Sequence, residues 1–245
     1  MSFGLALMMA ASAQETTTRT LPAAMPRLII QGGKSDITIR YDPELDNSEI
    51  VVTPTNWWEG CELSFSGDRR EATMAFLEDD GASRGCATEI ELSLAGRTDI
   101  EVWVEHGTVH VEDMPGELLV NMHSGRVTGT PAGESTIALR RGRVKLWDLT
   151  APVDAAVKLG RIDLTYAESF AGTVAANVMV GQIVTRFPYG TWLDAAVSTG
   201  VGRQVHAIPS RATATTHLDA ASRVGSIRVK AIVEAEEDVV LSAAE

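Results

Sequence analysis

The chain has 245 residues, a formal net charge of −12, 44% apolar residues and only 5% aromatic residues. This length allows one large domain or two small ones, and the composition does not fit a disordered chain. The acidic balance argues against general nucleic-acid binding, which needs a broad basic face. No run of 18 apolar residues follows the N-terminus, so we expect no membrane span after it.

Residues 1–13 have the features of an export signal. A short apolar run over residues 3–11 ends in Ala11-Ser12-Ala13, a small-x-small pattern of the kind that signal peptidases read. No Lys or Arg precedes the run, so a fortuitous apolar N-terminus is the alternative interpretation. We expect cleavage after Ala13, a linker over residues 14–26, and a periplasmic, extracellular or cell-surface location.

The chain opens its β region at residue 27 and contains two cysteines. Residues 27–99 are expected to form an N-terminal β region, with an irregular, charged insertion or a hairpin over residues 53–88, pinned by a disulfide and capping one end of the fold. Cys61 and Cys86 both lie in this insertion, and an exported chain with two cysteines usually pairs them. A reactive or metal-binding pair is the alternative, although no CxxC spacing supports it.

A repeat with a period near twenty begins at residue 100. Residues seven, five and three positions before successive glycines are apolar at 19 of 21 positions, and the alternation resumes two and four residues after most of them. Such period-2 alternation is typical of strands, and a glycine between two strands allows a sharp corner. The repeat glycines are Gly107, Gly125, Gly142, Gly160, Gly181, Gly200 and Gly225.

One such unit cannot bury its apolar side alone, so the units must stack. We therefore predict an all-β fold with a single domain, a β-solenoid or β-helix-like stack of about seven coils over residues 100–233, followed by an acidic tail over residues 234–245. The coil at Gly200 breaks the pattern and is expected to carry an insertion or bulge. A β-sandwich of hairpins is the structural alternative.

Three features of the sequence together resemble those of a known family. They are the opening Leu28-Ile29-Ile30-Gln31-Gly32-Gly33, the charged midsection and the repeated x-Ala-x-Val-x-x-Gly units. Together with the export signal they resemble the putative adhesin family of bacterial envelope proteins, a toastrack-like β-solenoid domain of unknown function. The resemblance covers residues 27–233. It implies an envelope location and a non-enzymatic role, and it supplies no functional residues.

Basic residues gather in the middle of the repeat. Arg126, Arg143 and Arg161 directly follow three repeat glycines, with Lys145 close by, and residues 126–161 hold seven basic and three acidic side chains, a net charge of +4. These arginines are expected to stack as a ladder on consecutive coils. Two interpretations fit: a solvated face that resists aggregation, or a site for an anionic glycan, lipid headgroup or acidic protein.

Two further surfaces have the same kind of ambiguity. The outward position four before each glycine carries mostly small residues, which suits a flat contact face or simply a tolerant strand. Trp57 and Trp58 are candidates for stacking on a sugar or partner, and the alternative is that they cover a small core.

Catalytic motifs are absent from the sequence: there is no GxSxG elbow, P-loop or dinucleotide fingerprint. His106, His110, Glu112 and Asp113 cluster in sequence, but the corner at Gly107 separates the two histidines, so we expect no metal and no cofactor.

The sequence predicts a non-enzymatic, adhesin-like binding or scaffolding module of the cell envelope. A carbohydrate-active β-helix, hydrolase or lyase, is the alternative, and an envelope-stress component is a third; the oligomeric state is left open.

Overall fold

The computed structural model describes residues 15–23, 25–57, 60–78, 86–168 and 170–232. The predicted export signal, Trp58 and the acidic tail from residue 234 lie outside the described residues. Within those ranges all regular structure is β. The strands are β1 (Thr17–Pro22), β2 (Arg27–Tyr41), β3 (Asn47–Asn56), β4 (Cys61–Gly67), β5 (Glu71–Glu78), β6 (Ala87–Leu94), β7 (Asp99–Glu112), β8 (Leu118–Thr130), β9 (Ser135–Leu149), β10 (Val153–Tyr166), β11 (Gly172–Pro188), β12 (Leu193–His206) and β13 (Thr216–Ile232).

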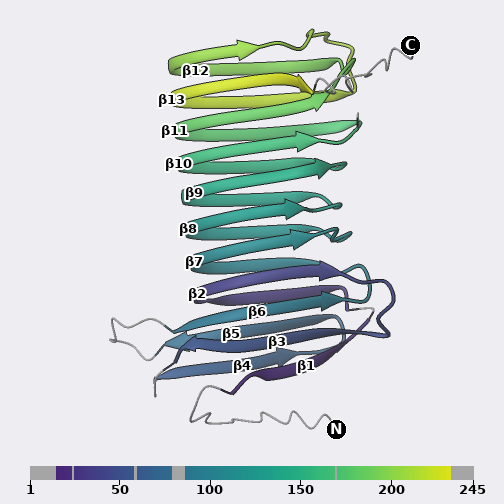
Figure 1. Cartoon of the computed structure of the whole chain (residues 1–245), viewed down its shortest axis with the longest axis vertical. Coiled ribbons are helices and arrows are strands. Elements are labelled where there is room, and N and C mark those ends of the chain that lie inside the picture. Colours follow the sequence, from purple (N-terminus) through teal and green to yellow (C-terminus); the bar gives the residue numbers. More distant parts are fainter. Residues whose placement is uncertain (1–14, 24, 58–59, 79–85, 169, 233–245) are drawn as a thin grey trace, which may run out of the picture.

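Each long strand is one coil of a solenoid that folds back on itself. Figure 1 shows a first arm running to one edge of the molecule, a sharp bend, and a second arm running back. We call the edge with the bends the corner edge and the opposite edge, where loops join the coils, the loop edge. The coils stack in parallel in the order β2-β7-β8-β9-β10-β11-β13-β12. The solenoid prediction is confirmed, and the sandwich of hairpins is wrong because these neighbours run parallel.

The core is the narrow space between the two arms. In β7 to β11 and in β13, the residues two positions after the corner glycines form one column in which every side chain is fully buried: Val109, Val127, Val144, Ile162, Ile183 and Ile227. In β12, at the end of the stack, this position is the exposed Gln204. This column belongs to a hydrophobic cluster that runs from β2 to β13. The space between the arms holds mainly aliphatic side chains, which is consistent with the low aromatic content of the sequence. The largest fully buried side chains are Tyr166 and Phe187, whose rings stack with their centres 4.9 Å apart.

The corner glycines lie directly above one another. Gly107, Gly125, Gly142, Gly160 and Gly181 are register partners in successive coils, and each has a φ between 141° and 159°. A Cβ at Gly160 would lie 1.8 Å from the carbonyl oxygen of Gly142, and the other members face the coil below at similarly short distances. Both the backbone conformation and the close stacking therefore require glycine.

The two ends of the stack depart from the predicted repeat. At the upper end the corner of β12 is Gly202, not Gly200, because Gly202 is the register partner of Gly225. In addition, β13 inserts between β11 and β12, so the last coil in sequence is not the last in space. At the lower end β2 adds a coil whose corner is the buried Ser35, and the Oγ of Ser35 lies 2.9 Å from that of Thr88 in β6.

The segment predicted as an irregular insertion or a hairpin is largely regular. It holds the end of β3, the antiparallel pair of β4 and β5, and the first two residues of β6. Strands β5 and β6 together continue the stack beneath β2, while β3 and β4 form an antiparallel layer below them. The predicted linker is also wrong over Thr17–Pro22, since the exposed edge of β3 offers backbone partners that β1 takes up. The segment thus lies at the lower end of the stack.

The disulfide between Cys61 and Cys86 is confirmed. It joins the start of β4 to the residue that precedes β6, so it ties the antiparallel layer to the parallel stack.

We predict that Gly160→Ala lowers the free energy of unfolding by about 3 kcal/mol or more, because it combines an unfavourable φ with a backbone clash. Gly190→Ala is the matched control: Gly190 has a φ of 83° but nothing lies within 4 Å of the added Cβ. That control should lose only about 1 kcal/mol. Equal losses in denaturant titrations would show that stacking at the corner contributes nothing.

Replacing both cysteines with serine should lower the free energy of unfolding by roughly 3 kcal/mol, since the bond closes a loop of 25 residues. Thermal unfolding with and without reductant checks this. Reductant should lower the midpoint of the natural chain and leave that of the double variant unchanged; a midpoint that resists reductant in both would contradict it.

Candidate functional site

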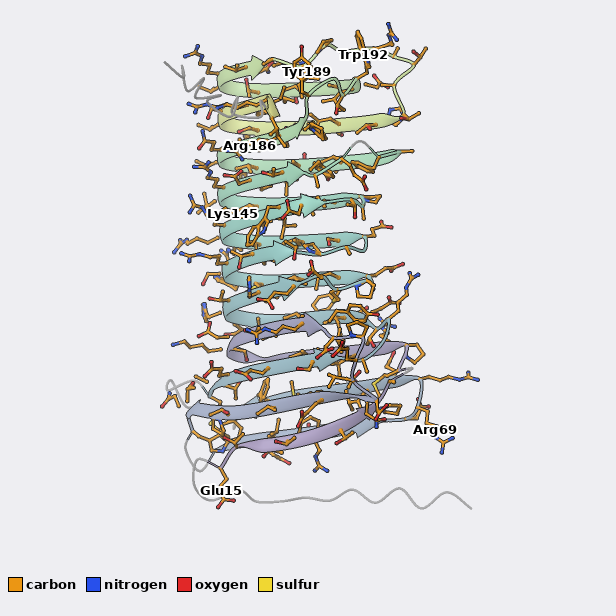
Figure 2. The ribbon with its side chains drawn as sticks, turned by 45° about the vertical axis from the view of Figure 1, so that its right-hand side comes forward. Glu15, Arg69, Lys145, Arg186, Tyr189 and Trp192 are labelled. Carbon is orange, nitrogen blue, oxygen red and sulfur yellow. A yellow bond between two sulfur atoms is a disulfide. The ribbon has the colours of Figure 1, made fainter. Side chains whose placement is uncertain are left out.

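The register of the coils brings the predicted arginine ladder together. Arg126 is the register partner of Arg143, and Arg143 is the register partner of Arg161. Neighbouring parallel strands lie about 4.8 Å apart, so the three arginines leave the corner edge at that spacing. Lys145 follows on the second arm of β9, with its Nζ 5.3 Å from the ring centre of Trp147. In Figure 2 nitrogen-tipped side chains stand along this edge, close to the labelled Lys145.

All the basic side chains of residues 126–161 lie near the corner. Each is within three positions of its corner glycine: Arg126, Arg140, Arg141, Arg143, Lys145, Lys158 and Arg161. The three acids of the same segment lie farther along the arms or outside them. Asp154 is six positions before its corner, Asp148 is six after, and Glu134 precedes β9. The coil geometry therefore separates the two signs of charge that the sequence mixes.

One member of the ladder is neutralised within the protein. Arg161 donates to the buried carboxylate of Asp163 over 2.8 Å, and Arg186 donates to the other oxygen of that carboxylate. Among the residues that the structure describes, Arg126 and Arg143 make no ion pair. Their guanidinium groups face solvent, and are the members of the ladder most open to an external anion.

A groove lies beside the ladder on the first arms. Its floor is the stripe of small residues four positions before the corners: Asn121, Ala138, Ala156, Asn177 and Ala221. Ser198, and not Ala196, continues the stripe in β12, because the corner there is Gly202. The groove has a volume of about 640 Å³, and His123, Arg140, Lys158 and Arg223 line the side toward the corner. No Asp or Glu is among its described lining residues.

The corner edge also carries an apolar feature that the sequence reasoning did not single out. The residue immediately before the corner glycine is Leu159 in β10, Val180 in β11, Val224 in β13 and Val201 in β12. All four are exposed, and they are register partners in that order. We call them the apolar ridge. The sequence carried this signal only in the later repeats, where an apolar residue directly precedes Gly160, Gly181, Gly202 and Gly225; His106, Ser124 and Arg141 hold the same position in the earlier coils.

The other predicted site residues do not converge. Trp57 is partly buried and packs against the hydrophobic cluster, so part of its surface serves as cover. His106 Nδ1 lies 2.6 Å from Ser124 Oγ, whereas His110 lies on the other side of the corner, against Thr128 and Glu112. Within the described ranges, no three His, Cys, Asp or Glu side chains are placed to hold a metal ion.

No protein-family model matches the chain, and no curated protein is similar to it. Several solved structures are similar to this chain at low sequence identity. A putative cell adhesion protein from Clostridium sporogenes is 11% identical, with a TM-score of 0.40, over 90% of this chain and 100% of its own. A putative adhesin from Bacteroides fragilis is 13% identical, with a TM-score of 0.40, over 90% of this chain and 98% of its own.

A putative adhesin from Parabacteroides distasonis is 10% identical, with a TM-score of 0.34, over 89% of this chain and 98% of its own. At such identities and TM-scores the likeness says nothing about a ligand or an activity. The described residues contain no helix that is long and apolar enough to cross a membrane.

We predict that Asp163→Asn lowers the free energy of unfolding by about 2 kcal/mol, because it leaves Arg161 and Arg186 without their shared carboxylate. Asp154→Asn, at an exposed position on the same strand, is the control and should change it by less than about 0.5 kcal/mol. Chemical denaturation measures both. The idea fails if the two variants are equally stable.

Proposed function

We propose that this chain is a non-enzymatic binding module of the cell envelope that attaches to an anionic surface through its corner edge. The observation that carries the proposal is the separation of charge. A chain with a net charge of −12 presents seven basic side chains at one edge of three consecutive coils, and Arg126 and Arg143 among them make no ion pair with any described part of the chain.

The acidic remainder of the molecule does not cancel this edge. An arm of seven residues is roughly 23 Å long at about 3.3 Å per residue. Asp99, Glu117 and Glu134 line a small hollow near the far ends of the first arms. At physiological ionic strength charges are screened over about 8 Å, so a ligand at the corner edge experiences mainly the local basic charge.

The form of the ladder favours a repetitive anion. Guanidinium groups bind carboxylates, sulfates and phosphates through paired hydrogen bonds, and here they recur on neighbouring strands along a straight edge. An extended or planar array of such anions can contact several coils at once, which raises the overall affinity without a deep pocket. A glycan, a lipid surface and an acidic protein face all supply arrays of this kind.

The exported location is part of the proposal and has independent support. The disulfide that ties the cap to the stack is the kind of bond that persists in oxidising compartments outside the cytoplasm. The small-x-small pattern that ends at Ala13 agrees with this.

The carbohydrate-active alternative has less support. Glycoside hydrolysis usually needs two carboxyl groups that flank the scissile bond. The larger groove is concave and basic, but its described lining residues include no carboxylate. We therefore assign the groove to binding rather than to hydrolysis.

We predict that the triple variant Arg126→Ala, Arg143→Ala and Lys145→Ala loses at least about tenfold in affinity for immobilised heparin, because three cations leave the contact. The matched control replaces Arg69, Arg70 and Arg97 with alanine; these three are exposed and lie in the lower part of the molecule. Both triples change the net charge equally. If heparin retains the ladder variant and the control variant equally well, the basic residues of the corner edge are only a solvated face and the proposal is wrong.

A further inference from the structure

We infer that the upper corner edge, from β8 to β12, docks on a lipid bilayer that contains anionic lipids, and that the apolar ridge enters its headgroup region. This inference rests on the proposed function and selects one anionic surface among those it allows. The ridge supplies the reason, because neither a soluble polyanion nor a solvated face accounts for it.

The ridge is a continuous row of exposed apolar side chains. Leu159 is 40% exposed, Val180 and Val224 are each 42% exposed, and Val201 is 67% exposed. They occupy the same position in four successive coils, in the order β10, β11, β13 and β12. Met179, 45% exposed, lies next to Val180. Single exposed apolar residues are ordinary, but a contiguous row at a convex edge marks a contact surface.

Cations flank the ridge on both arms. Lys158 and Arg223 precede Leu159 and Val224 on the first arms, and Arg203 follows the corner of β12 on its second arm. Arg161 follows the corner of β10 but is held by Asp163. Long basic side chains beside an apolar row can extend to phosphate groups while the row sits among the upper parts of the acyl chains. A convex apolar row with bases beside it matches a surface that is anionic outside and apolar within.

The edge changes character toward the lower end. In β8 and β9 the ridge position is taken by Ser124 and Arg141, so the apolar row gives way to charge. In β7 and β2 the corner carries the exposed acids Glu105 and Asp36. The favourable surface therefore extends from β8 upward. The remainder of the rod would stand away from an anionic bilayer.

The arrangement separates attraction from insertion. The charges of Arg126, Arg143 and Lys145 draw the edge to any anionic surface, and their effect falls with salt. The ridge contributes only where an apolar interior exists, and its contribution is insensitive to salt. A free polyanion uses the first group of residues alone, and a bilayer uses both.

The experiment measures sedimentation of the full chain with phosphatidylcholine vesicles that contain or lack phosphatidylglycerol, beside retention on heparin. The test variant replaces Leu159, Val180 and Val224 with threonine, which keeps a good strand former at each site. We expect the natural chain to sediment only with the anionic vesicles. The variant should bind them at least about tenfold more weakly and keep its heparin retention.

Tyr189→Ser is the matched apolar control, because Tyr189 is strongly exposed but lies in the turn after β11. It should bind vesicles like the natural chain. A second readout attaches an environment-sensitive dye to Val180→Cys, whose emission should shift to the blue on anionic vesicles; the same dye at Tyr189→Cys should not respond.

The outcomes separate the two proposals. The bilayer proposal is overturned if heparin retains the natural chain but anionic vesicles do not sediment it. It is also overturned if the threonine variant sediments with the vesicles as well as the natural chain does. Either result leaves the proposal of an anion-binding edge intact. If the natural chain is neither retained on heparin nor sedimented with anionic vesicles, both the anion-binding edge and the bilayer proposal are overturned. If the threonine changes instead convert an oligomer to a monomer in analytical ultracentrifugation and vesicles stay unbound, the ridge is a contact between copies and the bilayer is again overturned.

Discussion

The close stacking of the corner backbones is the constraint on which the rest of this structure depends. From β7 upward each corner is a glycine with positive φ that lies directly over the carbonyl of the corner residue in the neighbouring coil, with no room for a Cβ. This contact keeps successive coils in register around the corner, so each position near it becomes a straight column; the register shift between β9 and β10 lies at Leu164 and Tyr166, near the loop edge. The apolar core, the arginine ladder, the small-residue groove and the apolar ridge are four such columns.

The same constraint converts a mixed sequence into a polarised molecule. Along the chain, basic and acidic residues of the middle coils alternate within a few positions. In the fold, the seven bases of residues 126–161 gather at the corner edge, whereas the three acids of that segment lie about 20 Å away, toward the loop edge. Asp163, which lies near the corner of β10, is engaged by Arg161 and Arg186. Since this distance exceeds the screening length, a protein of strongly negative net charge can hold a basic contact surface.

The repeat and the ladder could be predicted from the sequence, because both follow from local spacing. Alternation marks the inward column, glycine marks the corner, and a residue at a fixed offset from each glycine must stack on its equivalent. The exceptions depend on contacts between distant segments. Nothing local shows that β13 inserts between β11 and β12, that Ser35 replaces glycine beside Thr88, or that Thr17–Pro22 pairs with β3. The pairing of Arg161 with Asp163 and Arg186 also needed the register, since Arg186 comes from the next coil.

The central claim is that Arg126 and Arg143 contact the anionic ligand directly. Arginine-selective chemical modification, read residue by residue by mass spectrometry with and without heparin, tests it without altering the protein. The account predicts that heparin protects Arg126 and Arg143 strongly and leaves Arg69 and Arg97 at the lower end as reactive as before. Equal protection of all four, or protection of the lower pair alone, would contradict it.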